Sequence, residues 1–182
     1  KDCDIVISAG NTGALLVISK LNLKMIENID KPALSALWPN KKGMSVVLDL
    51  GANIECNSKN LFDFSVMGAS LYKSLYPSET PIVALLNIGS EEFKGNETIK
   101  ETFKILKEKN FEEFNFSGYI EGNELMNGNV NVIVSDGFTG NVALKTAEGT
   151  ANFITSELKK ALSNNLIGKI SSLLNISNLN KF

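Results

Sequence analysis

Two short stretches of the sequence repeat one combination of glycine and threonine where an apolar run gives way to a helical pattern. Gly10–Gly13 reads Gly-Asn-Thr-Gly and Gly137–Gly140 reads Gly-Phe-Thr-Gly, and both follow an apolar run that contains a serine. Free N–H groups and the positive dipole end of a helix favour anions, and a threonine hydroxyl can add a cap or a donor. The repeat therefore predicts a phosphate-type site held by backbone. Neither copy is Gly-x-Gly-x-x-Gly, so the dinucleotide fingerprint is absent.

Four apolar runs end alike, in a small polar residue, one further residue and a glycine. In a doubly wound sheet these ends share one edge, where ligands bind, and glycine lets the backbone approach a ligand closely. The alternative is structural, because α/β folds use glycine after strands in any case. The polar residues are Ser8, Asp49, Asn87 and Ser135. With the two turns, the predicted phosphate- and substrate-binding residues are Ser8, Gly10, Asn11, Thr12, Gly13, Asp49, Asn87, Gly89, Ser135, Asp136, Gly137, Thr139 and Gly140.

One lysine stands apart from the other cations. Lys94 lies in a glycine-bounded loop that opens a helix, close to a predicted strand end. The loop is not a phosphate-binding Walker A loop, because its glycines are misplaced. We expect Lys94 to face an anion, the alternative being a solvated surface lysine. Glu91 and Glu92 are expected to solvate the loop or to pair with Lys94.

The composition removes several kinds of chemistry. The chain has no histidine, which excludes Ser-His and Cys-His nucleophile pairs and histidine-ligated metals from this stretch. All 18 basic residues are lysine, so an anion must be held by backbone N–H groups, lysine and amides. A net charge of −2 gives no reason to expect nucleic acid. Cys3 and Cys56 form no metal or disulfide pattern, so we expect no metal, no cofactor and a reducing, cytoplasmic setting.

Short apolar runs alternate with longer helical patterns, which predicts a three-layer α/β/α sandwich with a mainly parallel sheet. No apolar run approaches the roughly 20 residues that span a bilayer. The expected strands are Asp4–Ser8, Ser45–Leu50, Ile82–Ile88, Asn115–Ile120 and Asn131–Ser135, with a weaker candidate at Ala33–Leu37. The expected helices are Thr12–Lys24, Ser58–Leu75, Glu97–Lys109 and a long one from Thr139, with a single turn at Asn123–Met126.

The last part of the chain has a different pattern. From Phe153 onward apolar residues recur every four positions, a spacing that drifts around a straight helix. Asn164, Asn165 and Gly168 form the natural break, so two amphipathic helices are expected. They could pack on a partner helix, lie on a membrane surface or belong to the core. We therefore divide the chain into an α/β/α core, residues 1–150, and a helical extension, residues 151–182.

Several motifs taken together resemble one family. They are AGNTGA (Ala9–Ala14), LDLGAN (Leu48–Asn53), Met67-Gly68, LLNIG with KGNE (Leu85–Glu97), EGNEL (Glu121–Leu125) and DGFTGNVALKTAEG (Asp136–Gly149). Their order and content resemble the bacterial phosphate acyltransferases, which make acyl-phosphate from acyl-acyl-carrier protein and inorganic phosphate for phospholipid synthesis. The resemblance implies a fold similar to isocitrate and isopropylmalate dehydrogenases. The family's Asp-Ala-Met-Gly-Gly-Asp segment and its histidine-containing C-terminal region are not in this chain.

The resemblance also implies roles for residues. Lys94 of KGN and Asn141 of FTGN are the residues tied to catalysis. It implies a homodimer and an extension that meets carrier protein or membrane, so the protein is expected to be cytoplasmic with peripheral contact at the inner face of the cell membrane. Lysines suited to an acidic carrier protein are Lys159, Lys160 and Lys169.

Three alternatives compete with this interpretation. A decarboxylating dehydrogenase of similar fold would need arginines for a polycarboxylate and an aspartate cluster for a metal, and neither is present. A phosphate acetyltransferase-like enzyme that uses acyl-coenzyme A shares the chemistry and stays open. A non-catalytic scaffold that binds carrier protein also stays open, although it would not need the two Gly-x-Thr-Gly turns.

Overall fold

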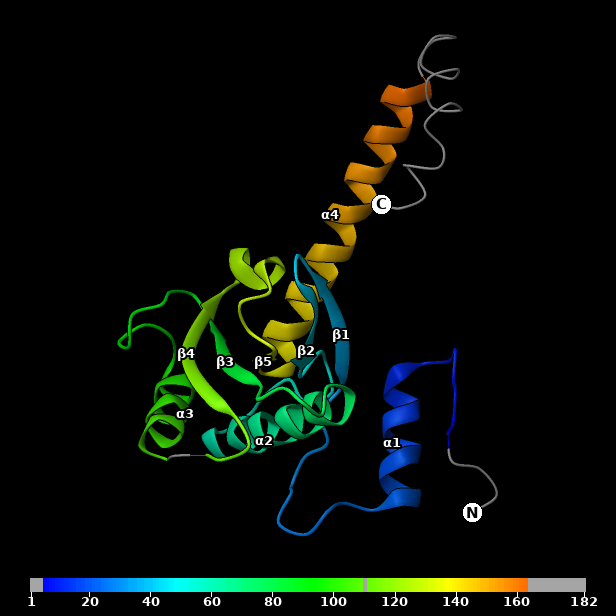
Figure 1. Ribbon diagram of the computed structural model, residues 1–182. Coiled ribbons are helices and arrows are strands. Elements are labelled where there is room, and N and C mark those ends of the chain that lie inside the picture. Colours follow the sequence, from blue (N-terminus) through cyan, green and yellow to red (C-terminus); the bar gives the residue numbers. More distant parts are fainter. Residues whose placement is uncertain (1–4, 110, 164–182) are drawn as a thin grey trace. The chain divides into compact units, whose positions relative to one another are not determined.

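The computed structural model describes residues 5–109 and 111–163. The chain forms two compact units, Lys1–Asn141 and Val142–Phe182. The first unit contains a five-stranded sheet, and the described part of the second continues a single helix (Figure 1). The predicted division at residue 150 stays a prediction.

The sheet is mainly parallel, and its strand order is β1-β2-β5-β3-β4. Only β1 runs antiparallel to its neighbour, β2, while the other neighbours are parallel. The last strand in the chain, β5, therefore lies between β2 and β3, which puts the carboxyl ends of these three strands side by side. The predicted α/β class with a mainly parallel sheet flanked by helices is confirmed. The strands are β1 (Ser35–Asn40), β2 (Gly43–Leu48), β3 (Ile82–Asn87), β4 (Asn115–Glu121) and β5 (Val132–Val134).

The central strands are continuous apolar runs because both of their faces are covered. All three residues of β5 are at most 1% exposed. The same holds for Val83, Ala84 and Leu85 of β3, and the next residue, Leu86, is 6% exposed. The weaker strand candidate at Ala33–Leu37 is confirmed in its second half, because β1 forms a hairpin with β2. Its Trp38 lies opposite Ser45 in the register and is buried.

Two helices, α2 (Ser58–Leu75) and α3 (Glu97–Glu108), pack against each other and against the sheet (Figure 1). Asn57 and Asn60 start α2 with reciprocal side-chain to backbone hydrogen bonds, a capping box. Gly68 lets α2 approach the sheet closely, since a Cβ there would lie 2.5 Å from Cγ1 of Val132. Both helices are where the sequence predicts them.

The amphipathic pattern of α3 decides which of its faces is buried. Asn96 caps the helix by accepting from the Ile99 N–H at 2.9 Å. Ile99 and Leu106 are 8% and 1% exposed, and the ring of Phe103 packs beside the aromatic side chains of β4. The single turn predicted after β4 is also present, as the 3-10 helix η1 (Gly122–Asn127).

The strand predicted at Asp4–Ser8 is not formed. The described part, residues 5–8, has no strand pairing, and Ile5, Val6 and Ile7 are 74–93% exposed. An apolar run becomes a strand only when a neighbouring strand supplies hydrogen bonds, and neither edge of the sheet pairs with this one. The helix that follows, α1 (Thr12–Leu23), is present as predicted, with no buried residue. Ser8 therefore does not extend from a strand of the sheet.

The long helix predicted from Thr139 is present as α4 (Gly137–Ser163), which starts in the first unit and continues through the described part of the second. Within the second unit, Phe153, Ile154 and Leu158 are 65%, 57% and 47% exposed. The break predicted at Asn164, the second amphipathic helix and Lys169 lie outside the described residues.

Candidate functional site

Three of the four predicted polar residues meet at the carboxyl edge of the sheet. The N–H of Asp49, just after β2, donates to the carbonyl of Ser135, just after β5, at 2.9 Å. The Ser135 N–H donates back to the carbonyl of Leu48 at 2.7 Å. Asn87 ends β3, the parallel neighbour of β5, so it lies at the same edge. The prediction of a shared edge is thus confirmed for Asp49, Asn87 and Ser135.

Asp49 organises the loop that follows β2. Its side chain is completely buried, and its carboxylate accepts five hydrogen bonds. Four come from backbone N–H groups at 2.8–3.1 Å, and the fifth comes from the Asn53 amide at 2.7 Å; the backbone donors are Leu34, Gly51, Ala52 and Asn53. A carboxylate so fully used is an internal support rather than a group turned toward a ligand.

The two glycines of the second Gly-x-Thr-Gly turn let α4 press its first residues onto that loop. A Cβ on Gly137 would lie 2.5 Å from the carbonyl oxygen of Asn53. A Cβ on Gly140 would overlap the carbonyl oxygen of Asp49. No other residue type fits at either position without moving backbone, so both glycines serve close packing between α4 and the end of β2.

The start of α4 is already capped by its own chain. The N–H and the hydroxyl of Thr139 both donate to the carboxylate of Asp136 at 2.8 Å. The Gly137 N–H donates to the carbonyl of Asn53 at 2.8 Å. Among the described residues, only the Phe138 N–H in this first turn has no acceptor. An anion arriving here would meet that single N–H beside the charge of Asp136, so the cradle predicted at Gly137–Gly140 offers fewer donors than the sequence suggests.

The first Gly-x-Thr-Gly turn is built differently. Asn11 caps α1 by accepting from the Ala14 N–H at 3.0 Å, and the Gly10 N–H donates to the Ser8 hydroxyl at 3.2 Å. Every residue from Ser8 to Ala14 is exposed. No hydrogen bond among the described residues joins this turn to the sheet. A role in anion binding stays a prediction for these residues: Ser8, Gly10, Asn11, Thr12 and Gly13.

Asn87 holds the loop that carries Lys94. Its side-chain amide donates to the carbonyls of Gly89 and Lys94, both at 3.2 Å. A Cβ on Gly95 would lie 2.5 Å from the Asn87 side-chain oxygen, and one on Gly89 would lie 3.1 Å from Cγ of Lys94. The two glycines thus give the Asn87 amide and the lysine stem room to lie against the backbone. The loop is fixed where Lys94 leaves it.

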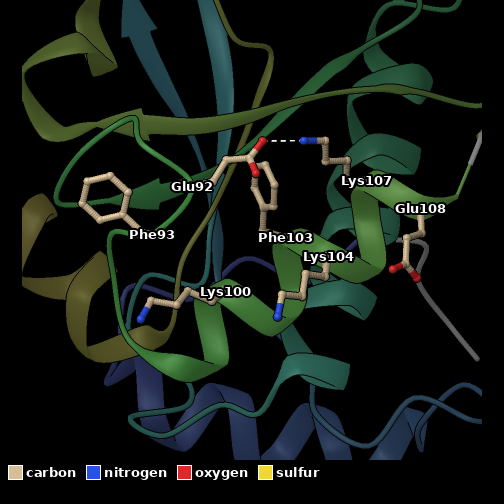
Figure 2. A pocket seen from close by; sticks show the side chains of 7 residues that line it. All are labelled: Glu92, Phe93, Lys100, Phe103, Lys104, Lys107 and Glu108. Carbon is tan, nitrogen blue, oxygen red and sulfur yellow. Dashed lines mark hydrogen bonds and ion pairs between the residues drawn. The ribbon is translucent and has the colours of Figure 1, made fainter.

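The ammonium group of Lys94 is not used by a neighbouring carboxylate. It lies 5.6 Å from the centre of the Phe93 ring, and no ion pair in the described part of the chain includes it. Figure 2 shows instead that Glu92 pairs with Lys107 of α3, beside the ring of Phe103. Of the two roles expected for Glu92, loop solvation or pairing with Lys94, the pairing is not formed, and the Lys94 charge is open to an anion.

Asn141 lies one turn into α4. It directly follows Gly140, which packs closely against the loop after β2. Its side chain is exposed, and its Cβ and Cγ are 3.5 Å from where a Cβ on Gly51 would be. No hydrogen bond of its amide occurs within the described residues, so the amide is free to donate. Gly51 has a φ of +129°, which favours glycine, so the backbone beside Asn141 is a turn of fixed shape.

A hollow of about 440 Å³ opens at this edge, between the segments that follow β2, β3 and β5. Asp136 and Thr139 belong to the predicted set and line it. Sequence reasoning missed the other lining residues. The signal that could have found two of them is an apolar residue in the segment that follows a strand, Ile54 after β2 and Phe138 after β5. The missed residues are Ile54, Glu55, Cys56, Leu61, Asn96, Thr98, Ile99 and Phe138.

Cys56, in the wall of the hollow, is not an activated nucleophile. Burial raises the pKa of its thiol above the ordinary value of 9.0, and this outweighs a backbone hydrogen bond from Gly137 that lowers it. The thiol is therefore neutral near pH 7. The part of the chain that the structure describes gathers no group of three acidic, cysteine or histidine side chains suited to a metal ion. None of its helices is long and apolar enough to cross a membrane.

The fold and the site define an α/β protein whose candidate ligand groove lies at the carboxyl edge of a mainly parallel sheet. Near this edge lie Lys94 and Asn141, whose side chains have no hydrogen-bond or ion-pair partner among the described residues. The model of the fatty acid synthesis protein family matches residues 1–182, so the chain belongs to that family.

Individual relatives agree with this assignment. The chain is 81% identical over 182 residues to a phosphate acyltransferase of Pelagibacter ubique, covering 100% of this chain and 55% of that protein. It is 46% identical over 172 residues to the phosphate acyltransferase of Rhizobium etli, covering 94% of this chain and 49% of the relative. The chain therefore spans about half the length of the curated relatives it matches.

The fold also occurs in a solved structure. The EutD phosphotransacetylase from Staphylococcus aureus superposes with a TM-score of 0.58 at 18% sequence identity, over 74% of this chain and 46% of that one. At this identity the likeness concerns the fold alone.

Proposed function

We propose that this chain is part of an acyltransferase that makes acyl-phosphate from acyl-acyl-carrier protein and inorganic phosphate, for phospholipid synthesis. The observation that carries the proposal is 81% identity, along the whole chain, to a protein named phosphate acyltransferase. The unpaired ammonium of Lys94 beside the carboxyl edge supports it, because this reaction needs a cation for phosphate and no histidine.

The chemistry is transfer of an acyl group from sulfur to oxygen. A phosphate oxygen attacks the thioester carbonyl carbon, and the new C–O bond gives a tetrahedral intermediate with a negative oxygen. This intermediate collapses, the C–S bond breaks, and the carrier thiolate leaves and takes a proton from solvent. Phosphate is already an anionic nucleophile at neutral pH, so the protein has to supply orientation and charge stabilisation rather than a base.

We assign Lys94 to the phosphate charge. Asn87 fixes the loop through the carbonyls of Gly89 and Lys94, so the backbone from which the Lys94 side chain extends is held near the edge before substrate arrives. Such preorganisation is what makes a charge effective in a transition state. Lysine suits this task as a compact point charge, since the chain has no arginine to bind phosphate with two parallel hydrogen bonds.

We assign Asn141 to the oxyanion. Its amide has no partner among the described residues, and its backbone is held by the close contacts of Gly137 and Gly140 with the loop after β2. Asp49 supports the same loop with five hydrogen bonds. A neutral amide donor there can stabilise the intermediate without a proton transfer. Removing one such donor typically lowers kcat by about 10²–10³-fold.

Partner surfaces follow from the same proposal. Lys159, Lys160 and Lys169 would meet the acidic carrier protein. The apolar residues of α4 beyond Phe153 would join two copies in a homodimer or lie on the inner face of the cell membrane. The protein would then act in the cytoplasm with peripheral membrane contact. Sedimentation of the full-length protein tests the dimer, and a monomer would remove that part of the proposal.

The runner-up is the same transfer from acyl-coenzyme A. The two are separated by one assay on the full-length protein, in which acyl-phosphate is trapped with hydroxylamine after adding phosphate and either donor. We expect product from acyl-carrier protein at a higher kcat/KM than from the matching acyl-coenzyme A. The opposite preference would favour the runner-up, and no product from either donor would leave a non-catalytic scaffold.

A further inference from the structure

A different hollow, of about 410 Å³, lies between α3 and the loop that follows β3 (Figure 2). It shares no lining residue with the hollow at the carboxyl edge. Phe93 of the loop lines it and is 72% exposed, and Phe103 of α3, which is partly buried, lines it as well. An aromatic ring left so exposed beside a concave surface is typical of a place where another molecule binds.

Three lysines of α3 line the hollow beside these rings: Lys100, Lys104 and Lys107. Their spacing of four and three residues puts them on one face of the helix. The Lys107 ammonium lies 5.3 Å from the centre of the Phe103 ring, so charge and aromatic surface are presented together. We call Phe93, Phe103 and the three lysines the α3 surface.

The charges of the α3 surface are only partly neutralised within the chain. Lys107 pairs with Glu92, and Lys100 pairs with Glu97 at 3.0 Å. No ion pair or hydrogen bond among the described residues includes the Lys104 ammonium. Two of the three ammonium groups are thus held by carboxylates of the chain, and the third is left for a partner.

The shape and the charge pattern favour an acidic protein as that partner. The side chains of Lys107 and Glu92 are 58% and 66% exposed, whereas a small-ligand site buries most of its ligand. The glutamates of α3, Glu97, Glu101 and Glu108, form a stripe of their own beside the lysines. A flat anionic membrane would meet both stripes at once, whereas a protein presents its carboxylates at discrete positions.

We propose that the α3 surface docks the acidic carrier protein that delivers the acyl group. The inference rests on the proposed acyl transfer and adds the surface of the first unit at which the donor binds. Phe93 directly precedes Lys94, so a carrier protein bound against Phe93 lies next to the loop that holds the phosphate-binding charge. The α3 surface is separate from the lysines of the extension, which belong to the second unit.

The parts of this surface have different tasks in docking. An aromatic side chain in contact with a partner supplies much of the affinity, while charges around it steer the encounter and select the partner. Phe93 is the aromatic contact and Lys104 is the unpaired charge. Their replacement should therefore weaken binding in ways that respond differently to salt.

The first test is the affinity of the full-length protein for unacylated acyl-carrier protein, measured by titration calorimetry. Lys104→Glu should raise Kd about fivefold at low salt, because it replaces an attraction by a repulsion. At about 0.5 M salt the effect should fall below about twofold, since exposed charges are then screened. Lys20→Glu is the matched control, because Lys20 is an exposed lysine of α1 with no ion pair in the described part of the chain. It should leave Kd unchanged.

Phe93→Ala tests the aromatic contact. It should raise Kd about tenfold at both salt concentrations, because the loss of apolar contact is not screened. The midpoint of urea unfolding should stay near the native value in Phe93→Ala and in Lys104→Glu, since both side chains are exposed. Native affinity in both variants would overturn the proposal, and so would an equal loss in Lys20→Glu.

A second test locates the contact directly. A carbodiimide joins an ammonium group to a carboxylate that touches it, and mass spectrometry identifies the joined residues. We expect Lys104 to be joined to carboxylates of the carrier protein, and high salt to prevent the product. Cross-links confined to Lys159 and Lys160 would place the carrier protein on the extension and overturn its docking on α3.

These outcomes are separate from those of the acyl transfer assay, because neither test needs turnover. Binding that Lys104→Glu weakens, without acyl-phosphate formation, supports the docking surface while the proposed reaction falls. Acyl-phosphate formation with the same kcat/KM in native and Lys104→Glu protein at low salt overturns the docking surface while the proposed reaction holds. Binding to anionic phospholipid vesicles but not to carrier protein, again weakened by Lys104→Glu, would also overturn it and indicate a membrane contact.

Discussion

The two Gly-x-Thr-Gly turns have nearly the same sequence but different surroundings. At Gly10–Gly13 the helix starts after Asn11, which supplies the cap, and a Cβ on Gly13 would meet only the side chain of Asn11, at 3.2 Å. At Gly137–Gly140 the helix starts at the first glycine, and both glycines touch the backbone of another segment. The motif thus encodes a helix start in both places. What its glycines are for depends on the neighbours that the fold brings to them.

The largest difference should appear when the last glycine of each turn is replaced by alanine. Gly140→Ala forces a Cβ into the carbonyl of Asp49, so we expect it to destabilise the first unit by about 3 kcal/mol. Gly13→Ala adds a methyl group to an exposed helix, so we expect a change within about 1 kcal/mol, in the stabilising direction. Urea unfolding of the full-length protein measures both. Equal effects at the two glycines would show that the close contact at Gly140 is not decisive.

The second prediction concerns chemistry next to the second turn. Lys94→Ala and Asn141→Ala should each lower kcat by about 10²-fold, or about 2.7 kcal/mol in the barrier. The midpoint of urea unfolding should change little, because neither side chain is buried. The readout is acyl-phosphate formation beside a melting curve. Near-normal activity of both variants would move the reacting centre away from this edge.

The caps provide a third, smaller contrast. Asp136→Ala and Asn11→Ala each remove a side chain that accepts from the start of a helix, and each should cost about 1 kcal/mol of stability. Only Asp136→Ala should also strengthen phosphate binding, because it removes a negative charge beside the open Phe138 N–H. Calorimetric titration with inorganic phosphate tests this. Weaker phosphate binding by Asp136→Ala would indicate that Asp136 positions the anion instead of repelling it.

The smallest effect is expected from Cys56, next to the second turn. Because burial raises its pKa, the folded state favours the neutral thiol. Its contribution to stability is complete below the ordinary value of 9.0 and is lost as the pH rises through the higher folded value. The native protein should therefore lose more in melting temperature between pH 8 and pH 10.5 than Cys56→Ser does, by about a degree. If the melting temperature changes equally with pH in both proteins, the thiol has the same pKa in the folded and the unfolded state.

Local pattern was enough to predict most elements of the fold. The runs that became β2, β3 and β5 are rich in apolar residues, whereas β4 mixes apolar residues with polar ones and a glycine. The pattern of α3, with Asn96 before it, determined both its start and its buried face. The run predicted at Asp4–Ser8 is also rich in apolar residues, but its described part, residues 5–8, forms no strand because strand formation needs a partner edge. The weaker run at Ala33–Leu37 became part of β1 because β2 provides one.

The candidate site was predictable in part, for a similar reason. The sequence by itself placed Asp49, Asn87 and Ser135 at one edge, since parallel strands share the direction of their ends. The sequence did not predict that the Asp49 carboxylate accepts five hydrogen bonds or that Glu92 pairs with Lys107. It also did not predict that Asp136 caps the start of α4. These pairings depend on side chains from segments far apart in the chain or on rotamers chosen by packing.

The sequence therefore determined the class of fold, the helix starts and which residue types are available for chemistry: lysine and amides, with neither histidine nor arginine. Only the tertiary structure decided which of these groups are left unpaired. Lys94 and Asn141 are open because their neighbours are engaged elsewhere, and Ile54 and Phe138 share one hollow because β5 lies between β2 and β3. Hydrogen bonding and apolar contact act over a few ångströms, so they are determined only when the chain has brought distant residues together.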